Sequence, residues 1–318
     1  YITLDGDYYV PEEIIGSSIE SLYRKTIEFQ NNTYFTLFEK LKNHLFKKHA
    51  EMVQTKNGER TVEGWAKEDA RYIVSLATLT QFGMTVNART LEYMLRKLRA
   101  GRLAEIRDAA DKLFSHVRDI APSIVRFTVP ELYDISRPGE IRNTVDSLLK
   151  GKCSSSSQDD KSVILLYYTP DADDILCASV IFHNSQQSFE QSLRIAKNLS
   201  YEDKYSLVKS TLLHRNFYDP VDRFFESMDF AFELTISSSN YAQLKRHRMS
   251  SQITQEYNIA LGITIPESIH EIGMDRIFLE AICETELFYN KLKSLFPQSA
   301  DYILTNSHRK KVYFKLNG

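Results

Sequence analysis

The tripeptide Arg246-His247-Arg248 is the part of this sequence best suited to chemistry. Each guanidinium carries a rigid fork of donors that suits a phosphate or a polarised carbonyl, and the imidazole between them can hydrogen-bond or stack. Lys245 adds further positive charge. A solvated basic run at the end of a helix would have the same composition, because the helix dipole favours cations there. Composition alone therefore does not distinguish a binding site from a solvated helix end, and the surrounding residues have to be considered.

Metal and thiol chemistry find no support in the sequence. The other histidines share no spacing typical of metal ligands, so we expect no metal site. Cys153, Cys177 and Cys283 are far apart and outside any CxxC pattern, which indicates neither a disulfide framework nor a zinc site. None of the three is next to a His that could activate it. We expect reduced thiols and no cysteine nucleophile.

The block that precedes the basic tripeptide combines a strand pattern with a capped helix. Apolar residues alternate from Met228 to Ile236, which predicts a half-buried strand. The serines at 237 to 239 then predict the start of a short helix that runs into Arg246. This block resembles the region of the flavin-dependent thymidylate synthases in which an FTF-like strand leads into an ISRA…QxxRHR helix.

Further motifs of that family are matched earlier in the chain. They are Ala70-Arg71 for E-x-A-R, Thr85 to Arg89 for NAR, Leu98-Arg99 for LR, Ala104 to Arg107 for A-Q-x-E-I-R, and Tyr1 for the end of S-x-R-Y. The resemblance covers nearly the whole chain. It implies FAD as cofactor, NADPH as reductant, and transfer of a methylene from methylenetetrahydrofolate to dUMP without an enzymic cysteine. The absence of a poised cysteine agrees with that chemistry.

The resemblance also implies roles for individual residues. Those matched to FAD contacts are Asn87, Ala88, Arg89, Arg246, His247 and Arg248. Those matched to dUMP contacts are Arg71 for the phosphate, together with Gln243 and Arg246. Arg99 is the candidate catalytic residue that would polarise the uracil ring, with Arg96 as a competitor because the spacing around this motif departs from the family's.

Parts of the chain recur in order, which indicates a tandem repeat. The matched pairs are Tyr1 to Ile14 with Tyr257 to Ile269, Leu37 to Lys42 with Leu287 to Lys293, Asp69 to Val74 with Ser299 to Leu304, and Val86 to Ala88 with Leu316 to Gly318. The first copy has a polar insertion between Asn43 and Trp65 that contains an Asn57-Gly58 turn signal. We interpret residues 1–150 as the latter part of a first copy and 162–318 as the early and middle part of a second.

Residues 151–161 are rich in serine and predict a flexible linker between the copies. The second copy departs from the family in its nucleotide residues. Asp301 stands where the family has the phosphate-binding Arg, and a carboxylate would repel a phosphate. The segment from Gln252 to Tyr257 is shorter than the family's. We therefore expect the second copy to be degenerate for catalysis.

The elements that must position these residues are mixed helices and strands. Apolar spacing predicts a long helix from Ile19 to Leu45 with a packed aromatic face, a second helix from near Asn87, and a third from Ala104 to Ile120. Residues 163–168 read as a buried strand. There is no regular βαβ rhythm and no Gly-rich phosphate loop, so a Rossmann or P-loop fold is disfavoured. The predicted class is α+β, with a mixed sheet and long helices.

Composition sets the outer bounds. The chain has 318 residues, 42% hydrophobic and 26% charged, as in ordinary soluble proteins of one large domain or two. A net charge of −2 gives no electrostatic case for nucleic acid or an anionic membrane, and no apolar run reaches the roughly 18 residues of a membrane span. The chain opens on Tyr1 with neither an initiator Met nor a signal segment, so we expect the first copy to be incomplete at its start, and the repeat indicates that the second is incomplete at its end. The expected reduced thiols are typical of a cytoplasmic protein, which we expect here.

Members of the resembled family are homotetramers with active sites shared between subunits, so we expect an oligomer of that kind. The basic tripeptide should then face residues 87–89 across an interface within or between chains. The alternative is a non-catalytic scaffold or dimerisation protein descended from the enzyme.

Overall fold

The computed structural model describes residues 4–152 and 161–318, so Tyr1, Cys153 and most of the predicted linker lie outside the described residues. The chain forms two compact units. Unit 1 comprises Tyr1–Asp159 and Ile265–Ser307, and unit 2 comprises Asp160–Thr264 and His308–Gly318. Each unit therefore combines segments that are distant in the sequence. In the part of the chain described, every helix is too short or too polar to cross a bilayer.

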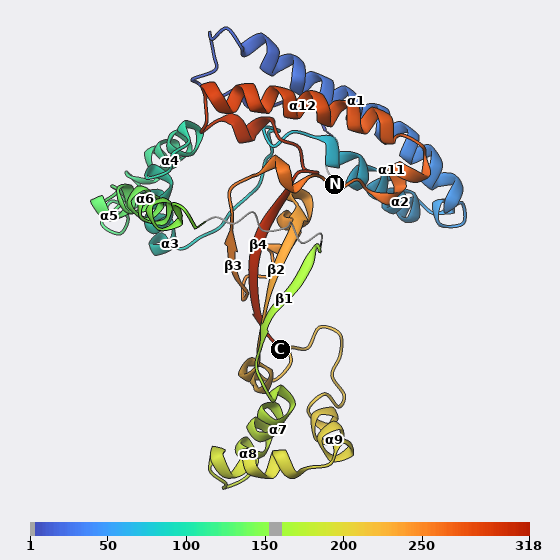
Figure 1. Cartoon of the computed structure of the whole chain (residues 1–318), viewed down its shortest axis with the longest axis vertical. Helices are drawn as coiled ribbons and strands as arrows, with labels where there is room; N and C mark the ends of the chain where they lie inside the picture. The colour runs from blue at the N-terminus through green and yellow to red at the C-terminus, as the bar shows by residue number, and fades with distance from the viewer. Residues whose placement is uncertain (1–3, 153–160) are drawn as a thin grey trace. The chain divides into compact units, whose positions relative to one another are not determined.

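Unit 1 is built on two long helices, α1 (Glu20–Lys48) and α12 (Asp275–Leu295), which pack side by side and run in opposite directions (Figure 1). The predicted long helix is confirmed and extends three residues past Leu45. Of the aromatic residues predicted to pack along it, Tyr23, Tyr34 and Phe38 are buried, whereas Phe29 and Phe35 are exposed, which corrects the prediction for these two. Tyr23 packs edge-on against Phe288 of α12, with ring centroids 6.4 Å apart. The apolar faces of the two helices thus form one core.

Each long helix is followed, later in the chain, by a 3-10 turn: η2 (Arg71–Ile73) and η5 (Ala300–Ile303). The segments after these turns pair with each other through an isolated antiparallel bridge between Ser75 and Thr305. The amide of Leu76 donates to the carbonyl of Leu304 at 2.8 Å, and the amide of Asn306 donates to the carbonyl of Val74 at 3.0 Å. This bridge joins the two predicted copies within unit 1.

The insertion in the first copy is helical, which corrects the predicted turn at Asn57-Gly58. After η1 (Met52–Gln54), α2 (Lys56–Ala70) begins with these two residues in its first turn. The hydroxyl of Thr55 caps the helix by accepting from the amide of Gly58 at 3.0 Å. A Cβ at Gly58 would lie 1.9 Å from the carbonyl oxygen of Met52, so glycine is needed here for close packing and not for a hairpin turn. The short α11 (Glu267–Glu271) contacts α2.

A smaller set of helices completes unit 1: α3 (Ala88–Arg99), α4 (Ala104–Val117), α5 (Leu132–Ile135) and α6 (Arg137–Leu149). The helices predicted near Asn87 and Ala104 are confirmed, although α4 ends three residues before Ile120. They pack around a small core that contains Leu95, Ala110 and Val125.

Unit 2 contains a four-stranded sheet of β1 (Val163–Tyr168), β2 (Asp229–Ser237), β3 (Ser251–Thr254) and β4 (Arg309–Asn317), in the order β1-β2-β4-β3. Every pairing is antiparallel, which corrects the predicted mixed sheet. The α+β class itself is confirmed. β2 and β3 run in the same direction, but β4 lies between them, so no parallel pair forms.

Three helices, α7 (Ala172–His183), α8 (Phe189–Asn198) and α9 (Tyr201–Thr211), form a bundle beyond one end of the sheet (Figure 1). With η3 (Arg223–Ser227), they return the chain to the end where β1 finished, so β2 runs antiparallel to it. The prediction that residues 163–168 are buried is wrong. β1 is an edge strand whose only neighbour is β2, and Val163 and Tyr168 are each 57% exposed.

Candidate functional site

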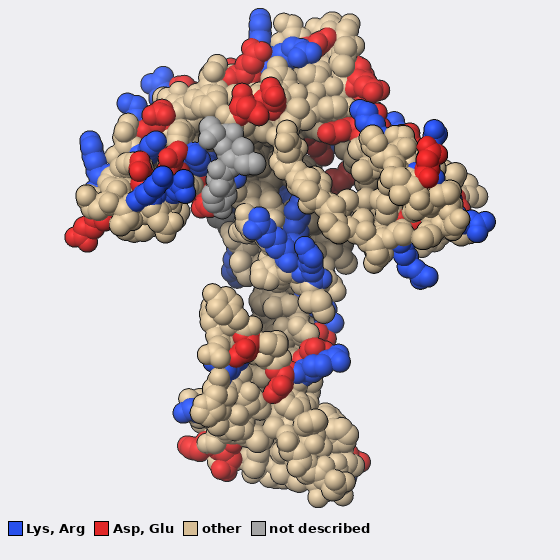
Figure 2. All heavy atoms as spheres, turned by 180° about the vertical axis from the view of Figure 1, so that it is seen from behind, with Lys and Arg blue, Asp and Glu red and all other residues tan. Residues whose placement is uncertain are grey.

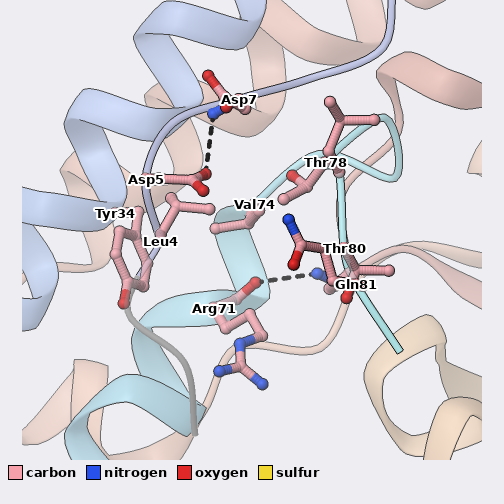
Figure 3. Close-up of a pocket in the computed structure, with 11 residues that line it drawn as sticks. Leu4, Asp5, Asp7, Tyr34, Arg71, Val74, Thr78, Thr80 and Gln81 are labelled. Atoms are coloured by element: carbon pink, nitrogen blue, oxygen red, sulfur yellow. Dashed lines mark hydrogen bonds between the residues drawn. The ribbon is translucent and has the colours of Figure 1, made fainter. Parts of the chain in front are cut away.

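A cavity of about 680 Å³ in unit 1 surrounds Arg71 (Figure 3). Its walls come from the N-terminal segment, α1, the η2 turn, the segment that follows that turn, and one residue after η5. The lining residues are Leu4, Asp5, Asp7, Tyr34, Arg71, Val74, Thr78, Leu79, Thr80, Gln81 and Asn306. The cavity is large enough for a mononucleotide-sized ligand.

Arg71 is the C-cap of α2 and the first residue of η2. The negative end of the α2 dipole favours a cation at this place. The side chain of Tyr34 is buried, and burial raises the pKa of its phenol while the positive charge of Arg71 acts in the opposite direction. In Figure 3 the guanidinium of Arg71 and the hydroxyl of Tyr34 point to the same side of the cavity. This side can therefore offer both a charged and a neutral donor to an anion.

Two carboxylates lie on the other side of the cavity. Asp5 Oδ1 accepts from the amide of Asp7 at 3.1 Å, and Figure 3 shows both residues on the opposite side from the Arg71 guanidinium. An anion near Arg71 would be kept away from these groups by repulsion, whereas the hydroxyl or amine groups of a ligand could donate to them. The cavity is thus polarised along its length.

Asp301 is the residue that the predicted repeat matches to Arg71. Its Oδ1 accepts from the hydroxyl of Tyr289 at 3.4 Å and lies 3.9 Å from the ammonium of Lys293. An anion that approached this place would meet a carboxylate.

The predicted FAD residues of the first copy lie at the start of α3. Asn87 is its N-cap, and the side chain accepts from the amide of Thr90 at 2.9 Å. Arg89 is exposed on the first turn and Ala88 is half-buried. The contact explains why the sequence begins a helix here, and it leaves the Arg89 side chain accessible.

Arg99 and Arg96, the two candidates for the catalytic arginine, are held within the α3–α6 helices. Arg99 Nε donates to Asp111 at 2.8 Å, its Nη1 donates to the hydroxyl of Thr128 at 2.8 Å, and its guanidinium lies over the ring of Phe114. Arg96 Nε lies 3.2 Å from the nearly buried carboxylate of Asp134. Neither residue lines the cavity around Arg71.

The basic tripeptide lies in unit 2 directly after α10 (Ser238–Leu244). Ser237 caps that helix by accepting from the amide of Asn240 at 3.1 Å, as the sequence predicts. Lys245 is the C-cap, and the side chains of Gln243 and residues 246–248 are exposed. Gln252 on β3 holds this turn by donating to the carbonyl of Leu244 at 3.2 Å.

More basic side chains belong to the same unit. The ammonium groups of Lys245 and Lys310 both lie over the ring of Tyr241, at 6.0 and 5.0 Å from its centroid, and Lys310 is also 4.4 Å from the ring of Tyr257. Figure 2 shows a group of basic side chains over the strands in the middle of that view. Two cations that share one ring repel each other, so an anion between them would be favoured. The donor set suits a diphosphate.

Thiol and metal chemistry have no evident place among the described residues. Cys177 is buried, and burial raises the pKa of its thiol, which disfavours the nucleophilic thiolate. Within residues 4–152 and 161–318, three His, Cys, Asp or Glu side chains nowhere come together as metal ligands would.

Sequence reasoning did not single out several residues of the cavity. Tyr34 was expected only as a packing residue, and Asp5, the segment Thr78 to Gln81, and Asn306 were not predicted. The closeness of Asn306 to Arg71 follows from the bridge between Ser75 and Thr305, which single-residue patterns do not reveal.

The chain matches one family model and several known proteins. The family model described as "Thymidylate synthase complementing protein" (Thy1) matches residues 1–123 and 164–318. A UPF0159 protein of Chlamydia muridarum is 24% identical over 318 residues, which is 98% of this chain and 60% of that protein. A UPF0159 protein of Thermoplasma acidophilum is 23% identical over 81% of this chain and 51% of its own length. The chain thus spans a little over half the length of these relatives.

A flavin-dependent thymidylate synthase of Clostridium tetani is 31% identical over 134 residues, which is 41% of this chain and 51% of that protein. A solved structure of the flavin-dependent thymidylate synthase ThyX of Helicobacter pylori, complexed with FAD and dUMP, overlaps 49% of this chain and 79% of its own. The identity is 17% and the TM-score 0.34. Since the family model covers most of the sequence, the chain belongs to the thymidylate synthase complementing protein (ThyX) family.

Proposed function

We propose that this chain provides the nucleotide site of a flavin-dependent thymidylate synthase, which converts dUMP to dTMP. The observation that carries the proposal is the cavity around Arg71, since the resemblance matches this residue to the family's phosphate-binding arginine and its side chain lines a cavity of about 680 Å³. The Arg71 guanidinium would bind the phosphate, with the hydroxyl of Tyr34 beside it. The carboxylates at the other side would accept from the sugar or base.

The exposed basic turn of unit 2 would hold FAD. Arg246 and Arg248, with Lys245 and Lys310 near them, offer the donors that a flavin diphosphate needs, and His247 can stack or hydrogen-bond. Gln243 and Arg246 would also reach dUMP, and residues 87–89 would contribute to the flavin site. Reduced flavin would supply the hydride, NADPH would reduce it, and methylenetetrahydrofolate would be the methylene donor. The proposal includes an oligomer in which such sites are shared.

We also propose that residues 1–150 and 162–318 are two copies of one module joined by a linker at 151–161. The buried residues of α1 correspond to those of α12 when 255 is added to each α1 residue number. The matched pairs are Tyr23 with Phe278, Ile27 with Ile282, Gln30 with Thr285, Tyr34 with Tyr289, and Leu37 with Leu292. This alignment matches Leu37 with Leu292. It corrects the sequence repeat, which matched Leu37 with Leu287. After the insertion in the first copy, the residue numbers of matched positions differ by 230. With this offset, Arg71 to Ala77 have the same pattern of buried and half-buried residues as Asp301 to Ser307.

The contacts between the copies are reciprocal, as in a symmetric dimer. Leu76 donates to Leu304 while Asn306, the counterpart of Leu76, donates to Val74, the counterpart of Leu304. Gln30 contacts its own counterpart, Thr285, at 2.7 Å. These contacts support an internal two-fold relationship within unit 1.

A binding experiment separates the two copies. Arg71→Ala should weaken dUMP binding by about 2–4 kcal/mol, as expected when a charge-assisted pair is lost from a partly desolvated site. Asp301→Ala should leave the affinity unchanged, because that carboxylate does not line the cavity. Calorimetric titration of both variants tests this. The opposite order of effects would remove the first copy as the nucleotide site.

Arg99, the arginine proposed to polarise uracil, already donates hydrogen bonds to Asp111 and Thr128. These bonds favour the alternative of a non-catalytic scaffold. In the catalytic proposal this arginine must exchange these partners for the substrate. If the purified chain binds neither dUMP nor flavin, the scaffold function is correct.

A further inference from the structure

Asn306 is the one residue of the second copy that lines the cavity around Arg71. It lies three residues beyond the end of η5 and is half-buried. Its carboxamide Nδ2 donates to the carbonyl oxygen of Arg71 at 3.2 Å. Its backbone amide donates to the carbonyl of Val74 at 3.0 Å. Asn306 therefore holds both ends of the four-residue segment that presents the Arg71 side chain.

The hydrogen bond from the Asn306 carboxamide has no equivalent at the position that the proposed two-fold relationship matches to it. The counterpart of Asn306 is Leu76, whose side chain cannot donate a hydrogen bond. The backbone bonds at positions 76 and 306 are symmetric, but this side-chain bond exists only on the side where the chain carries Arg71. The two differences between the copies, Arg71 against Asp301 and Asn306 against Leu76, thus affect the same cavity.

The carbonyl of Arg71 also accepts from the amide of Val74 at 3.0 Å, which closes the η2 turn. A second donor on the same oxygen restricts rotation of the peptide plane next to the Cα from which the guanidinium extends. A cation that is held in place before the ligand arrives loses less conformational freedom on binding. Removal of the second donor should therefore reduce affinity for the group that Arg71 contacts and for no other part of the ligand.

We propose that Asn306 is a positioning residue for Arg71, so that the phosphate subsite of the first copy is completed by the second copy. This inference rests on the proposed function, since it assumes that Arg71 binds the phosphate of a nucleotide. It adds that the site cannot be assembled from first-copy residues alone. The chemistry recognised is a phosphate monoester, and the effect of Asn306 on it passes through Arg71.

The test is a double-mutant cycle on the full 318-residue chain, with dUMP and deoxyuridine as separate probes in calorimetric titrations. Asn306→Leu installs the residue of the other copy, which has the same number of side-chain heavy atoms and the same branching but cannot donate a hydrogen bond. We expect it to weaken dUMP about tenfold, or about 1.4 kcal/mol, and to change deoxyuridine affinity less than about twofold. In an Arg71→Ala background the same substitution should have no further effect on dUMP.

Asn184→Leu is the matched control, because Asn184 Nδ2 also donates to a backbone carbonyl, that of Val180 in the α7 bundle, at 2.9 Å. It should leave both affinities unchanged. The inference is overturned if Asn306→Leu leaves dUMP affinity intact, weakens both probes equally, or retains its full effect without Arg71. If Arg71→Ala itself leaves dUMP affinity unchanged, or if the unaltered chain does not bind dUMP, the proposed function fails first and the inference fails with it.

Discussion

Two bonds between a serine and a carboxylate agree with the proposed two-fold relationship within unit 1. Ser268 Oγ donates to Asp69 Oδ2 at 2.6 Å, and Ser299 Oγ donates to the carboxylate of Glu13. The proposed repeat matches Glu13 with Ser268 and Asp69 with Ser299, so the same contact occurs twice with the donor and the acceptor exchanged. Such an exchange preserves the contact because a serine and a carboxylate remain opposite each other.

Asp69 gives a pH-dependent prediction at this scale. Burial raises the pKa of its carboxyl, and the bond from Ser268 opposes this effect without cancelling it, while Glu68 and Glu271 add to the rise. The native state therefore binds the proton more tightly than the unfolded chain does, and stability falls as pH rises through the raised pKa. Asp69→Asn, which can still accept from Ser268, should raise the melting temperature at pH 7 by about 2 °C.

The gain should shrink as pH is lowered toward the ordinary aspartate pKa of about 3.9, where both proteins carry a neutral side chain. Thermal unfolding of the two proteins between pH 4 and pH 7 measures this. A gain that is constant across that range would mean that the charge of Asp69 is not its cause.

The basic turn gives a second residue-scale prediction. Arg246→Ala combined with Arg248→Ala should abolish bound FAD, since the two guanidiniums are the proposed diphosphate donors. Arg223→Ala with Arg276→Ala is the control, because those arginines are also exposed and each pairs with a neighbouring glutamate on its own helical segment. The flavin absorbance of the purified proteins is the measurement. A full flavin spectrum in the first variant would exclude this turn as the cofactor site.

At the scale of elements, the central contact between α1 and α12 is polar. Gln30 is fully buried, and its Nε2 donates to the hydroxyl of Thr285 at 2.7 Å and to the carbonyl of Ile303 at 2.9 Å. Apolar residues surround this pair on both helices, including Ile27 and Ile282. One buried glutamine therefore sets the register of the helix pair and connects it to the η5 turn.

Gln30→Ala should lower the free energy of unfolding by about 2–4 kcal/mol, because it leaves a buried carbonyl without its donor and opens a cavity between the helices. Gln54→Ala is the control, since its Nε2 donates only to the carbonyl of Ala50 near the surface, and a loss below about 0.5 kcal/mol is expected. Urea unfolding followed by circular dichroism measures both. Equal losses in the two variants would show that the helix contact does not depend on Gln30.

At the scale of the whole molecule, the proposed duplication would ordinarily provide two equivalent nucleotide sites. The proposed second site lacks a cation, since Asp301 is matched to Arg71, and it lacks a counterpart of Asn306, since Leu76 occupies that position. We therefore predict one dUMP bound per chain, and not two. Calorimetric stoichiometry, with protein concentration from amino-acid analysis, measures this number. Two sites of similar affinity would show that the second copy binds the nucleotide without an arginine at this position.

The elements that local chemistry specifies were predictable from the sequence. The alternation in β2, the serine cap of α10, the asparagine cap of α3 and the apolar spacing of α1 each act within a few residues, so each leaves a readable pattern. The family also follows from short motifs, and these motifs indicate Arg71 as the candidate phosphate-binding residue.

What only the tertiary structure decided depends on contacts between distant residues. The exposure of β1 follows from its place at the sheet edge, and the helical state of Asn57-Gly58 follows from the packing of Gly58 against the carbonyl of Met52. The engagement of Arg99 by Thr128 requires a loop 29 residues away, and the approach of Asn306 to Arg71 spans 235 residues. A sequence pattern records the preferences of neighbouring residues, whereas these contacts depend on which surfaces meet once distant segments of the chain have packed together.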